Sequence, residues 1–218
     1  MKIDLHVHTS ELSMCGQLKA EEIVRIYKDA GYDAVAITNH FNLDTAQHFE
    51  RHGISDYIGH YRRGFELARK EGEKVGLRVF FGYEIRFTEN INDYLVFGMP
   101  DEIAQNCKQL FAMRSAEFSA LAKENGFLFY QAHPFRNGMT VCNPAILFGI
   151  EVHNGHPGHD SRNDVANAWA EKYNLHKISG SDCHFESGAA KAGIITDKDV
   201  RTTEELTEIL RADDYYII

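Results

Sequence analysis

Two pairs of side chains with metal-binding chemistry lie near opposite ends of the chain. His6 and His8 form an H-x-H pair, and Asp182 and His184 form a D-x-H pair. Side chains two residues apart in an extended strand point to the same face, so each pair can direct two ligand atoms at one ion. Imidazole and carboxylate ligands are typical of sites for Zn, Mn or Fe, whereas a structural zinc site is usually rich in Cys. The two pairs therefore predict a metal site.

Further histidines and one carboxylate follow apolar, strand-like runs. His40 follows residues 33–38, Glu84 ends the run RVFFGYE, and His133 directly follows FLFYQA. Burying a carboxylate such as Glu84 in an apolar strand is costly unless it is paired or bound to a cation. Four other histidines lie in polar stretches of the sequence and are interpreted as surface residues: His48, His52, His60 and His176.

The elements that must position these residues alternate between strands and helices. Strands are expected at residues 2–7, 33–38, 78–84, 94–98, 127–132, 149–152, 175–179, 192–196 and 215–218. Amphipathic helices are expected at residues 19–30, 57–71, 115–125, 163–173 and 203–211. This alternation indicates one α/β domain over residues 1–218, with a parallel sheet, open or closed into a barrel, covered by helices. Ligand groups in such folds gather at the carboxyl ends of the strands, where the candidate residues lie.

Composition narrows the class of protein. The 218 residues carry a formal net charge of −9, which argues against binding nucleic acid through general basicity. No apolar run is long enough to span a membrane, and residues 1–6 lack the basic stretch followed by an apolar run that a signal peptide would have. The four cysteines are scattered, without a C-x-x-C pair, which favours a reduced, cytoplasmic protein. The oligomeric state is left open.

The ordered motifs resemble the PHP (polymerase and histidinol phosphatase) superfamily of metal-dependent phosphoesterases. They are DLHVHT at 4–9, ITNH at 37–40, GYE at 82–84, AHP at 132–134, EVHNG at 151–155 and GSDCH at 180–184. The resemblance implies a distorted (β/α)7 TIM-like barrel with two or three divalent ions (Zn, Mn or Fe) at the strand ends.

The resemblance also implies a set of metal ligands, with Glu84 as a carboxylate that bridges two ions. These ligands are His6, His8, Glu84, His133, Asp182 and His184, with His40 on a further ion. Two more ligands are open choices: Glu11 is preferred to Cys15 in the first loop, and His159 is preferred to His156 after Glu151. Asn39 stands where the family motif usually has Asp, which leaves the partner of His40 undefined.

The expected chemistry is hydrolysis of a small organic phosphomonoester by a metal-bridging hydroxide. Arg136 and Arg162 are the candidate phosphate-binding residues, and Asp182 and His184 are candidates for general acid–base work beside Glu84. The alternatives are a 3′–5′ exonuclease or phosphodiesterase acting on nucleic acid, and a metal-binding regulatory module without catalysis. A hydrolase of C–N bonds is disfavoured because no bridging Lys is found.

Overall fold

Eleven strands form two sheets in the computed structural model, which describes residues 1–218. The first sheet has the order β11-β10-β1-β2-β4, with bounds Tyr216–Ile217, Ile194–Ile195, Lys2–Val7, Ala34–Ile37 and Arg78–Phe81. The second has the order β3-β5-β6-β7-β8-β9, with bounds His40–Phe41, Tyr83–Arg86, Asp93–Phe97, Leu128–Gln131, Gly149–Asn154 and His176–Gly180. The predicted α/β class is confirmed.

Four connections pass from one sheet to the other, and the one between β4 and β5 leads directly to Glu84. The expected single strand over residues 78–84 is in fact β4 and β5, separated at Gly82. A Cβ at Gly82 would lie 3.0 Å from Thr38 Cγ2 and 3.1 Å from the Phe97 ring. The tight packing at this bend leaves no room for a side chain, which explains why residue 82 is glycine. After the bend, Glu84 lies in the second sheet.

The sheets also meet between β1 and the residues that follow β9. The His8 amide donates to the Cys183 carbonyl at 3.0 Å, and the Cys183 amide donates to the His6 carbonyl at 3.2 Å. This pairing is one isolated bridge between Val7 and Cys183 rather than a continuous ladder. It nevertheless sets the first and last candidate ligand pairs side by side.

The second sheet is mixed, which differs from the expected parallel arrangement. β6 runs antiparallel to both β5 and β7, whereas β7, β8 and β9 are mutually parallel. The short β5–β6 connection therefore places Arg86, at the end of β5, opposite Asp93, at the start of β6. Sequence patterning does not distinguish these directions, because buried parallel and antiparallel strands are both apolar.

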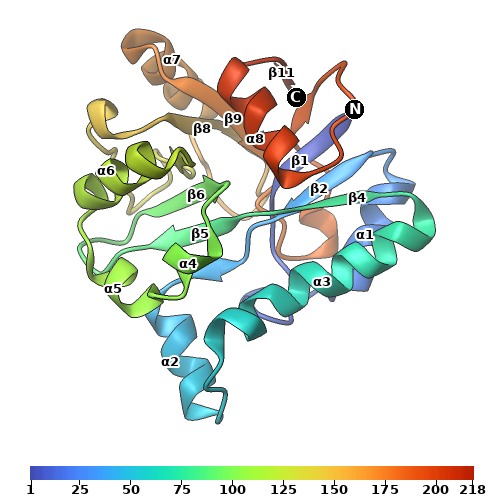
Figure 1. The fold of residues 1–218 in the computed structure, drawn as a ribbon. Helices are drawn as coiled ribbons and strands as arrows, with labels where there is room; N and C mark the ends of the chain where they lie inside the picture. Colours follow the sequence, from blue (N-terminus) through green and yellow to red (C-terminus); the bar gives the residue numbers. More distant parts are fainter.

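Helices cover the outside of the sheets (Figure 1). The expected helices are found as α1 (Ala20–Asp29), α3 (Tyr57–Val75), α6 (Ser115–Asn125), α7 (Asn163–Tyr173) and α8 (Thr203–Ala212). Three helices and two 3-10 turns were not expected: α2 (Leu43–Arg51), α4 (Asp101–Ala104), α5 (Cys107–Ala112), η1 (Pro144–Ile146) and η2 (Glu186–Gly188). No helix is both long and apolar enough to cross a membrane.

The apolar interior divides into two clusters of 38 and 16 buried residues. The larger cluster includes Ile23, Val24 and Tyr27, which lie on one face of α1 at helical spacing. The smaller one joins strand residues of both sheets to Leu206 and Leu210 of α8. Packing on both faces of the strands leaves their ends as the place for polar side chains.

Candidate metal centre

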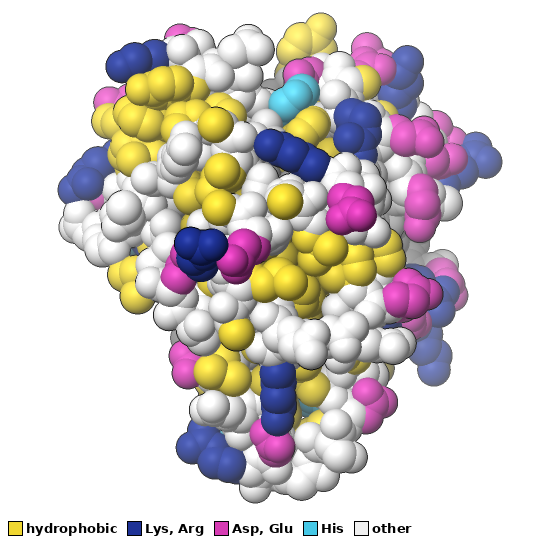
Figure 2. Space-filling view, turned by 60° about the vertical axis from the view of Figure 1, so that its left-hand side comes forward, with side chains coloured by type: hydrophobic (Ala, Val, Ile, Leu, Met, Phe, Trp, Pro, Cys, Tyr) yellow, Lys and Arg dark blue, Asp and Glu magenta, His cyan; other side chains and the backbone are white.

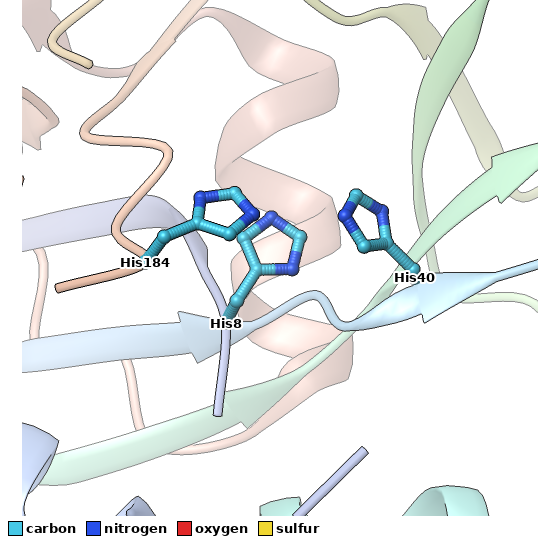
Figure 3. A group of neighbouring side chains, drawn as sticks. All are labelled: His8, His40 and His184. Carbon is cyan, nitrogen blue, oxygen red and sulfur yellow. The ribbon is translucent and has the colours of Figure 1, made fainter. Parts of the chain in front are cut away.

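Three imidazoles from distant parts of the chain face one another at the strand ends (Figure 3). His8 follows β1, His40 begins β3, and His184 follows β9. The ring centroids of His8 and His184 are 4.2 Å apart, and those of His8 and His40 are 4.5 Å apart. Each ring offers a nitrogen within 4.8 Å of the other two, which is a spacing that one metal ion can span.

Glu84 joins this group to a second one. Its Oε2 lies 2.6 Å from His40 Nδ1 and 3.4 Å from His8 Nε2. Its Oε1 lies 3.2 Å from both His6 Nε2 and His133 Nε2. The side chain of Glu84 is fully buried, and each of its two oxygens faces a different pair of imidazoles.

Asp182 is a second carboxylate close to His6 and His8. Its Oδ1 is 3.4 Å from His8 Nε2 and 3.5 Å from His6 Nε2, and its Oδ2 is 3.6 Å from His159 Nε2. Asp182 and His133 both adopt positive φ, at 50° and 28°. Such conformations are costly for residues other than glycine and are typical of functional sites.

Several buried atoms at this point make no hydrogen bond, although His40 Nδ1 and Glu84 Oε2 lie 2.6 Å apart. They include His6 Nε2, His8 Nε2, His40 Nδ1, Glu84 Oε2 and His159 Nε2. A buried polar atom without a partner is costly, and a converging set of them is unusual in a folded protein. Imidazole nitrogens and carboxylate oxygens directed at a common point fit divalent cations.

The electrostatics favour the ligand forms of both carboxylates and of His8, whereas the effect of burial on His6 and His40 is outweighed by the carboxylates around them, which raise the pKa of those two rings. Burial works to raise the pKa of Glu84, but the charges of His40 and His6 outweigh it and hold that pKa well below its usual range. Burial likewise opposes ionisation of Asp182, yet His6 and hydrogen bonding from His159 hold its pKa well below the usual value. The pKa of His8 is lowered by burial and by its neighbours His184 and His40, which favours the neutral ring. Carboxylates must be ionised and imidazole neutral to bind metal.

Outer partners set the orientation of the two rings of the H-x-H pair. His6 Nδ1 lies 3.0 Å from Glu151 Oε1, and His8 Nδ1 lies 3.1 Å from Ser13 Oγ. Ser13 donates its own proton to Asn39 Oδ1 at 2.9 Å, so it accepts from His8. Both rings are thereby protonated at Nδ1 and present Nε2 to the centre.

Sequence reasoning did not assign these roles to Glu151, Ser13 or Asn39. Glu151 lies in the apolar strand β8, as Glu84 lies in β5, and this shared pattern was an available signal. Asn39 replaces the usual Asp and holds the first loop, since its Oδ1 also accepts from the Thr9 amide at 2.8 Å. No sequence signal pointed to Ser13.

The first-loop ligand expected at Glu11 is not brought to the centre. Both carboxylate oxygens of Glu11 accept from the Ala20 amide at 3.1 Å, at the start of α1. Cys15 instead lines the site cavity. Burial works to raise the pKa of the Cys15 thiol, but hydrogen bonding from His184 and His40 brings it down to about 6.

Both late histidines line the same cavity, but they are oriented differently. His159 directs Nε2 toward Asp182, and its Nδ1 lies 3.0 Å from Ser161 Oγ. His156 stacks on His159, with ring centroids 4.3 Å apart, and its Nδ1 accepts from the Gly158 amide. The geometry therefore favours His159 over His156 as a candidate ligand.

The two candidate phosphate-binding arginines are separated by the structure. Arg136 lines the cavity, with its guanidinium 3.5 Å from Asp93 Oδ2. Arg162 instead donates to the Phe135 carbonyl at 3.1 Å and to Asn137 Oδ1 at 2.5 Å, and it braces this loop from outside the cavity. Arg86, which sequence reasoning missed, lines the cavity and forms a two-point ion pair with Asp93.

The cavity has a volume of about 360 Å³ and is polar, with Gln17 and Phe185 at its border. A larger surface cleft of about 640 Å³ lies between the start of α3 and α4–α5, but it holds no histidine cluster. The smaller cavity, which the histidines and carboxylates line, is therefore the candidate active site.

Known proteins similar to this chain share the fold of the whole domain. DNA polymerase III subunit alpha of Aquifex aeolicus (strain VF5) is 25% identical over 230 residues, covering 99% of this chain and 18% of that protein. A two-domain protein of Bacteroides vulgatus ATCC 8482, containing a predicted PHP-like metal-dependent phosphoesterase, is 23% identical, with a TM-score of 0.70 over 100% of this chain and 64% of that one. The chain thus spans about a fifth of the curated relative and under two thirds of the solved one.

A lesion-specific endonuclease, endonuclease Q of Pyrococcus furiosus, is also similar, with 13% identity and a TM-score of 0.64 over 99% of this chain and 57% of that chain. The expectation that nucleic acid is not a partner therefore gains no support from the comparisons. The family model described as PHP domain matches residues 4–217. With this match over almost its full length, the chain belongs to the PHP domain family.

Proposed function

We propose that the protein hydrolyses small organic phosphomonoesters with two or three divalent ions. The observation that carries this proposal is the convergence of buried, unpartnered imidazole and carboxylate atoms beside a small cavity that also contains two arginines. The proposed ligands are His6, His8, His40, Glu84, His133, His159, Asp182 and His184.

Glu84 is proposed to bridge two ions, because its two oxygens face different imidazole groups. Bound divalent ions supply Lewis acidity toward phosphate oxygens and acidify water to a useful nucleophile near neutral pH. The chain itself supplies orientation: Glu151 and Ser13 hold His6 and His8 in the tautomer that presents Nε2 inward.

Arg86 and Arg136 are proposed to bind the phosphate group. Asp93 lies between them, buried, and restrains both guanidinium groups at the cavity wall. A guanidinium can donate two parallel hydrogen bonds to phosphate oxygens. Arg86 uses Nε and one terminal nitrogen on Asp93, which leaves its other terminal nitrogen available.

His184 and Asp182 are proposed to move the proton at the cavity. The His184 ring borders the cavity, and its Nδ1 lies 2.9 Å from the Asp182 carbonyl, which leaves Nε2 for ligation or proton transfer. Asp182 is held as the ionised carboxylate by His6 and His159.

Cavity size and charge favour a monoester over a polymer. A volume of about 360 Å³ suits a small molecule, and the arginines that line it are both paired to Asp93. On the face shown in Figure 2, acidic and basic side chains are interspersed rather than gathered into a basic track of the kind that follows a nucleic-acid backbone. Nuclease activity is the second candidate, on the similarity to endonuclease Q and the polymerase subunit.

A substrate screen tests the proposal. The protein, loaded with Mn²⁺ or Zn²⁺, is assayed for phosphate release from sugar phosphates, nucleotides and histidinol phosphate, and for shortening or nicking of oligonucleotides. Release of phosphate from monoesters alone is expected. Oligonucleotide cleavage without monoester hydrolysis would favour the nuclease, and bound metal without either activity would indicate a binding module.

Glu84→Gln provides the matched variant. It should lower turnover by more than the roughly 10- to 100-fold that loss of an outer partner costs, because a bridging ligand is removed. Glu208→Gln, an exposed position on α8, should retain wild-type turnover. Wild-type activity in Glu84→Gln would exclude the bridging role.

A further inference from the structure

We propose that Phe185 makes the site selective for phosphomonoesters whose organic group carries a flat aromatic ring. The ring of the substrate packs against the Phe185 ring at the border of the cavity, and the phosphate group lies among the charged side chains of the same cavity. This inference rests on the proposed function and deepens it, because it names the class of organic group that the site accepts.

The Phe185 side chain is set apart from the other phenylalanines of the chain. All of the others belong to one of the two apolar clusters or pack against one, whereas Phe185 does neither. Its side chain is half-buried and borders the cavity, whose lining contains no other phenylalanine, tyrosine or tryptophan. Ligand cavities typically place aromatic side chains against the apolar part of a ligand. The position of Phe185 therefore indicates contact with the substrate rather than a role in the apolar interior.

The short turn η2 holds the Phe185 ring in place. The Gly188 amide donates to the Phe185 carbonyl at 2.9 Å, which closes this turn directly after the ring. A Cβ at Gly188 would lie 3.6 Å from Phe185 Cε2, so the ring packs against the turn. A side chain that is already ordered costs less conformational entropy when a ligand binds to it.

Imidazole rings continue the aromatic wall that Phe185 begins. The His156 ring lies 5.4 Å from the Phe185 ring between centroids, at an interplanar angle of 80°, and it is stacked on His159. The His156 ring also lines the cavity, and its Nδ1 accepts from the Gly158 amide at 3.0 Å, which fixes its orientation. Aromatic rings favour offset-stacked and edge-to-face contacts with one another. A flat ring of the substrate therefore finds favourable ring surfaces here that a saturated ring does not match.

The charged part of the cavity wall is separate from this aromatic part. Arg136 lies 3.5 Å from Asp93, and the other oxygen-to-nitrogen contact of Asp93 Oδ2 is with His133 Nε2 at 3.9 Å. The His133 ring lies 6.1 Å from the His159 ring, at which the stacked imidazoles begin. Along these contacts the lining changes from a charged end at Arg136 to an aromatic end at Phe185. One phosphomonoester can thus place its phosphate at the first end and its ring at the second.

A matched pair of substrates tests the inference on the metal-loaded, full-length chain. Benzyl phosphate and cyclohexylmethyl phosphate are both esters of a primary alcohol, and they differ in whether the ring is flat and aromatic or saturated. We expect kcat/KM to be about 2- to 10-fold higher for benzyl phosphate, which is the range that aromatic pairing contributes beyond the burial of area. A preference based on apolar area alone would favour the saturated ring.

Variants of Phe185 assign the preference to this ring. Phe185→Leu keeps an apolar side chain but removes the flat face, so it should raise KM for benzyl phosphate more than it lowers kcat, and the preference over the saturated substrate should disappear. Phe185→Tyr keeps the ring and should retain the preference. Phe49→Leu is the control, because Phe49 is a half-buried residue of α2 outside the cavity, and it should keep the wild-type preference.

Calorimetric titration with benzylphosphonate and cyclohexylmethylphosphonate, which have no ester bond to hydrolyse, separates binding from chemistry. Tighter binding of benzylphosphonate without phosphate release from any ester would support the selectivity and overturn the proposed hydrolysis. Equal affinities for the two phosphonates, or equal kcat/KM for the two esters, in the wild-type protein would overturn the inference and leave the proposed hydrolysis standing. A preference that persists in Phe185→Leu would overturn the assignment to Phe185.

Discussion

At the residue scale, the two histidines of the H-x-H pair have different outer partners. His6 is oriented by the buried carboxylate of Glu151, whereas His8 is oriented by the hydroxyl of Ser13. Glu151 also accepts from the His133 amide and from Asn154 Nδ2, so one carboxylate supports three parts of the site. The hydrogen-bond partners Glu151 and Ser13 thus determine which ring nitrogen of His6 and His8 is free to bind metal, whereas β1 determines only the position of each ring.

Ser13→Ala removes the acceptor for His8 Nδ1 and the donor to Asn39. We expect metal affinity, or kcat/KM, to fall by about 10- to 100-fold, because the His8 ring loses its fixed tautomer and orientation. Metal affinity is measured by competition with a chromophoric chelator. Ser10→Ala, at an exposed position of the same loop, is the control and should behave as wild type. Equal affinities in the two variants would mean that Ser13 does not orient His8.

At the element scale, the site depends on the close approach of β1 to the end of β9. A Cβ at Gly180 would lie 2.3 Å from His6 Cβ and 2.8 Å from the His6 amide nitrogen. Only glycine allows the backbone that leads into Asp182 to lie directly against His6. This contact brings two ligand pairs together although His6 and Gly180 are 174 positions apart in the sequence.

Gly180→Ala should separate these strands. We expect a loss of about 1 to 3 kcal/mol in the free energy of unfolding, together with weaker metal binding, because overpacking displaces the ligand pairs. Denaturant unfolding and metal titration measure the two effects. Gly188→Ala, where the new Cβ would meet its nearest atom at 3.4 Å, is the control and should change neither quantity much.

An ion pair between Arg25 and Glu71 joins α1 to α3. Glu71 of α3 lies 2.8 Å from Arg25 of α1 and 2.6 Å from Lys74, and hydrogen bonding from Lys74 and Arg25 holds its pKa below the ordinary value of 4.5. A depressed carboxyl pKa contributes stability above the unfolded pKa, and that stability is lost as the pH falls through the folded pKa.

Glu71→Gln should therefore be less stable than wild type at pH 7, with a difference that shrinks as the pH falls below about 4.5. Thermal unfolding across pH 3 to 7 measures this effect. Glu73→Gln, whose exposed pair with Arg69 contributes little, is the comparison on the same helix. A difference between Glu71→Gln and wild type that is constant over this range would contradict the assignment.

At the scale of the whole molecule, the candidate centre links both sheets. Its residues come from β1, from β3 and β5, and from the segments that follow β7 and β9. Bound ions would therefore link two sheets whose strands pair with each other only through one isolated bridge.

Removing metal should lower the melting temperature of the whole domain. Free ion at about 100 times its dissociation constant stabilises the native state by about 2.7 kcal/mol, or about 5 to 11 °C for a chain of this size. Scanning calorimetry with chelator, and again after Zn²⁺ is restored, measures the shift. Glu84→Gln should show a smaller shift, and an unchanged melting temperature in the wild type would contradict a structural contribution from the ions.

The amino-acid sequence by itself determined the class of fold and the chemical types at the site. The bounds of α6 and α7 were predicted to the residue, because helical periodicity and the glycine or asparagine that ends each helix act locally. Placing His6, His8, Asp182 and His184 together required only strand period and the rule that parallel strand ends share one edge.

Tertiary structure alone decided which first-loop side chain faces the centre, which arginines reach the cavity, and where the strand over residues 78–84 breaks. Glu11 is drawn to the amide of Ala20, Arg162 to the Phe135–Asn137 loop, and Gly82 to its bend against Phe97. These outcomes depend on partners distant in sequence or on the path of a loop, neither of which leaves a periodic pattern. Ligand types are local properties of the sequence, whereas the direction of a loop side chain is set by hydrogen bonds that exist only once the chain has folded.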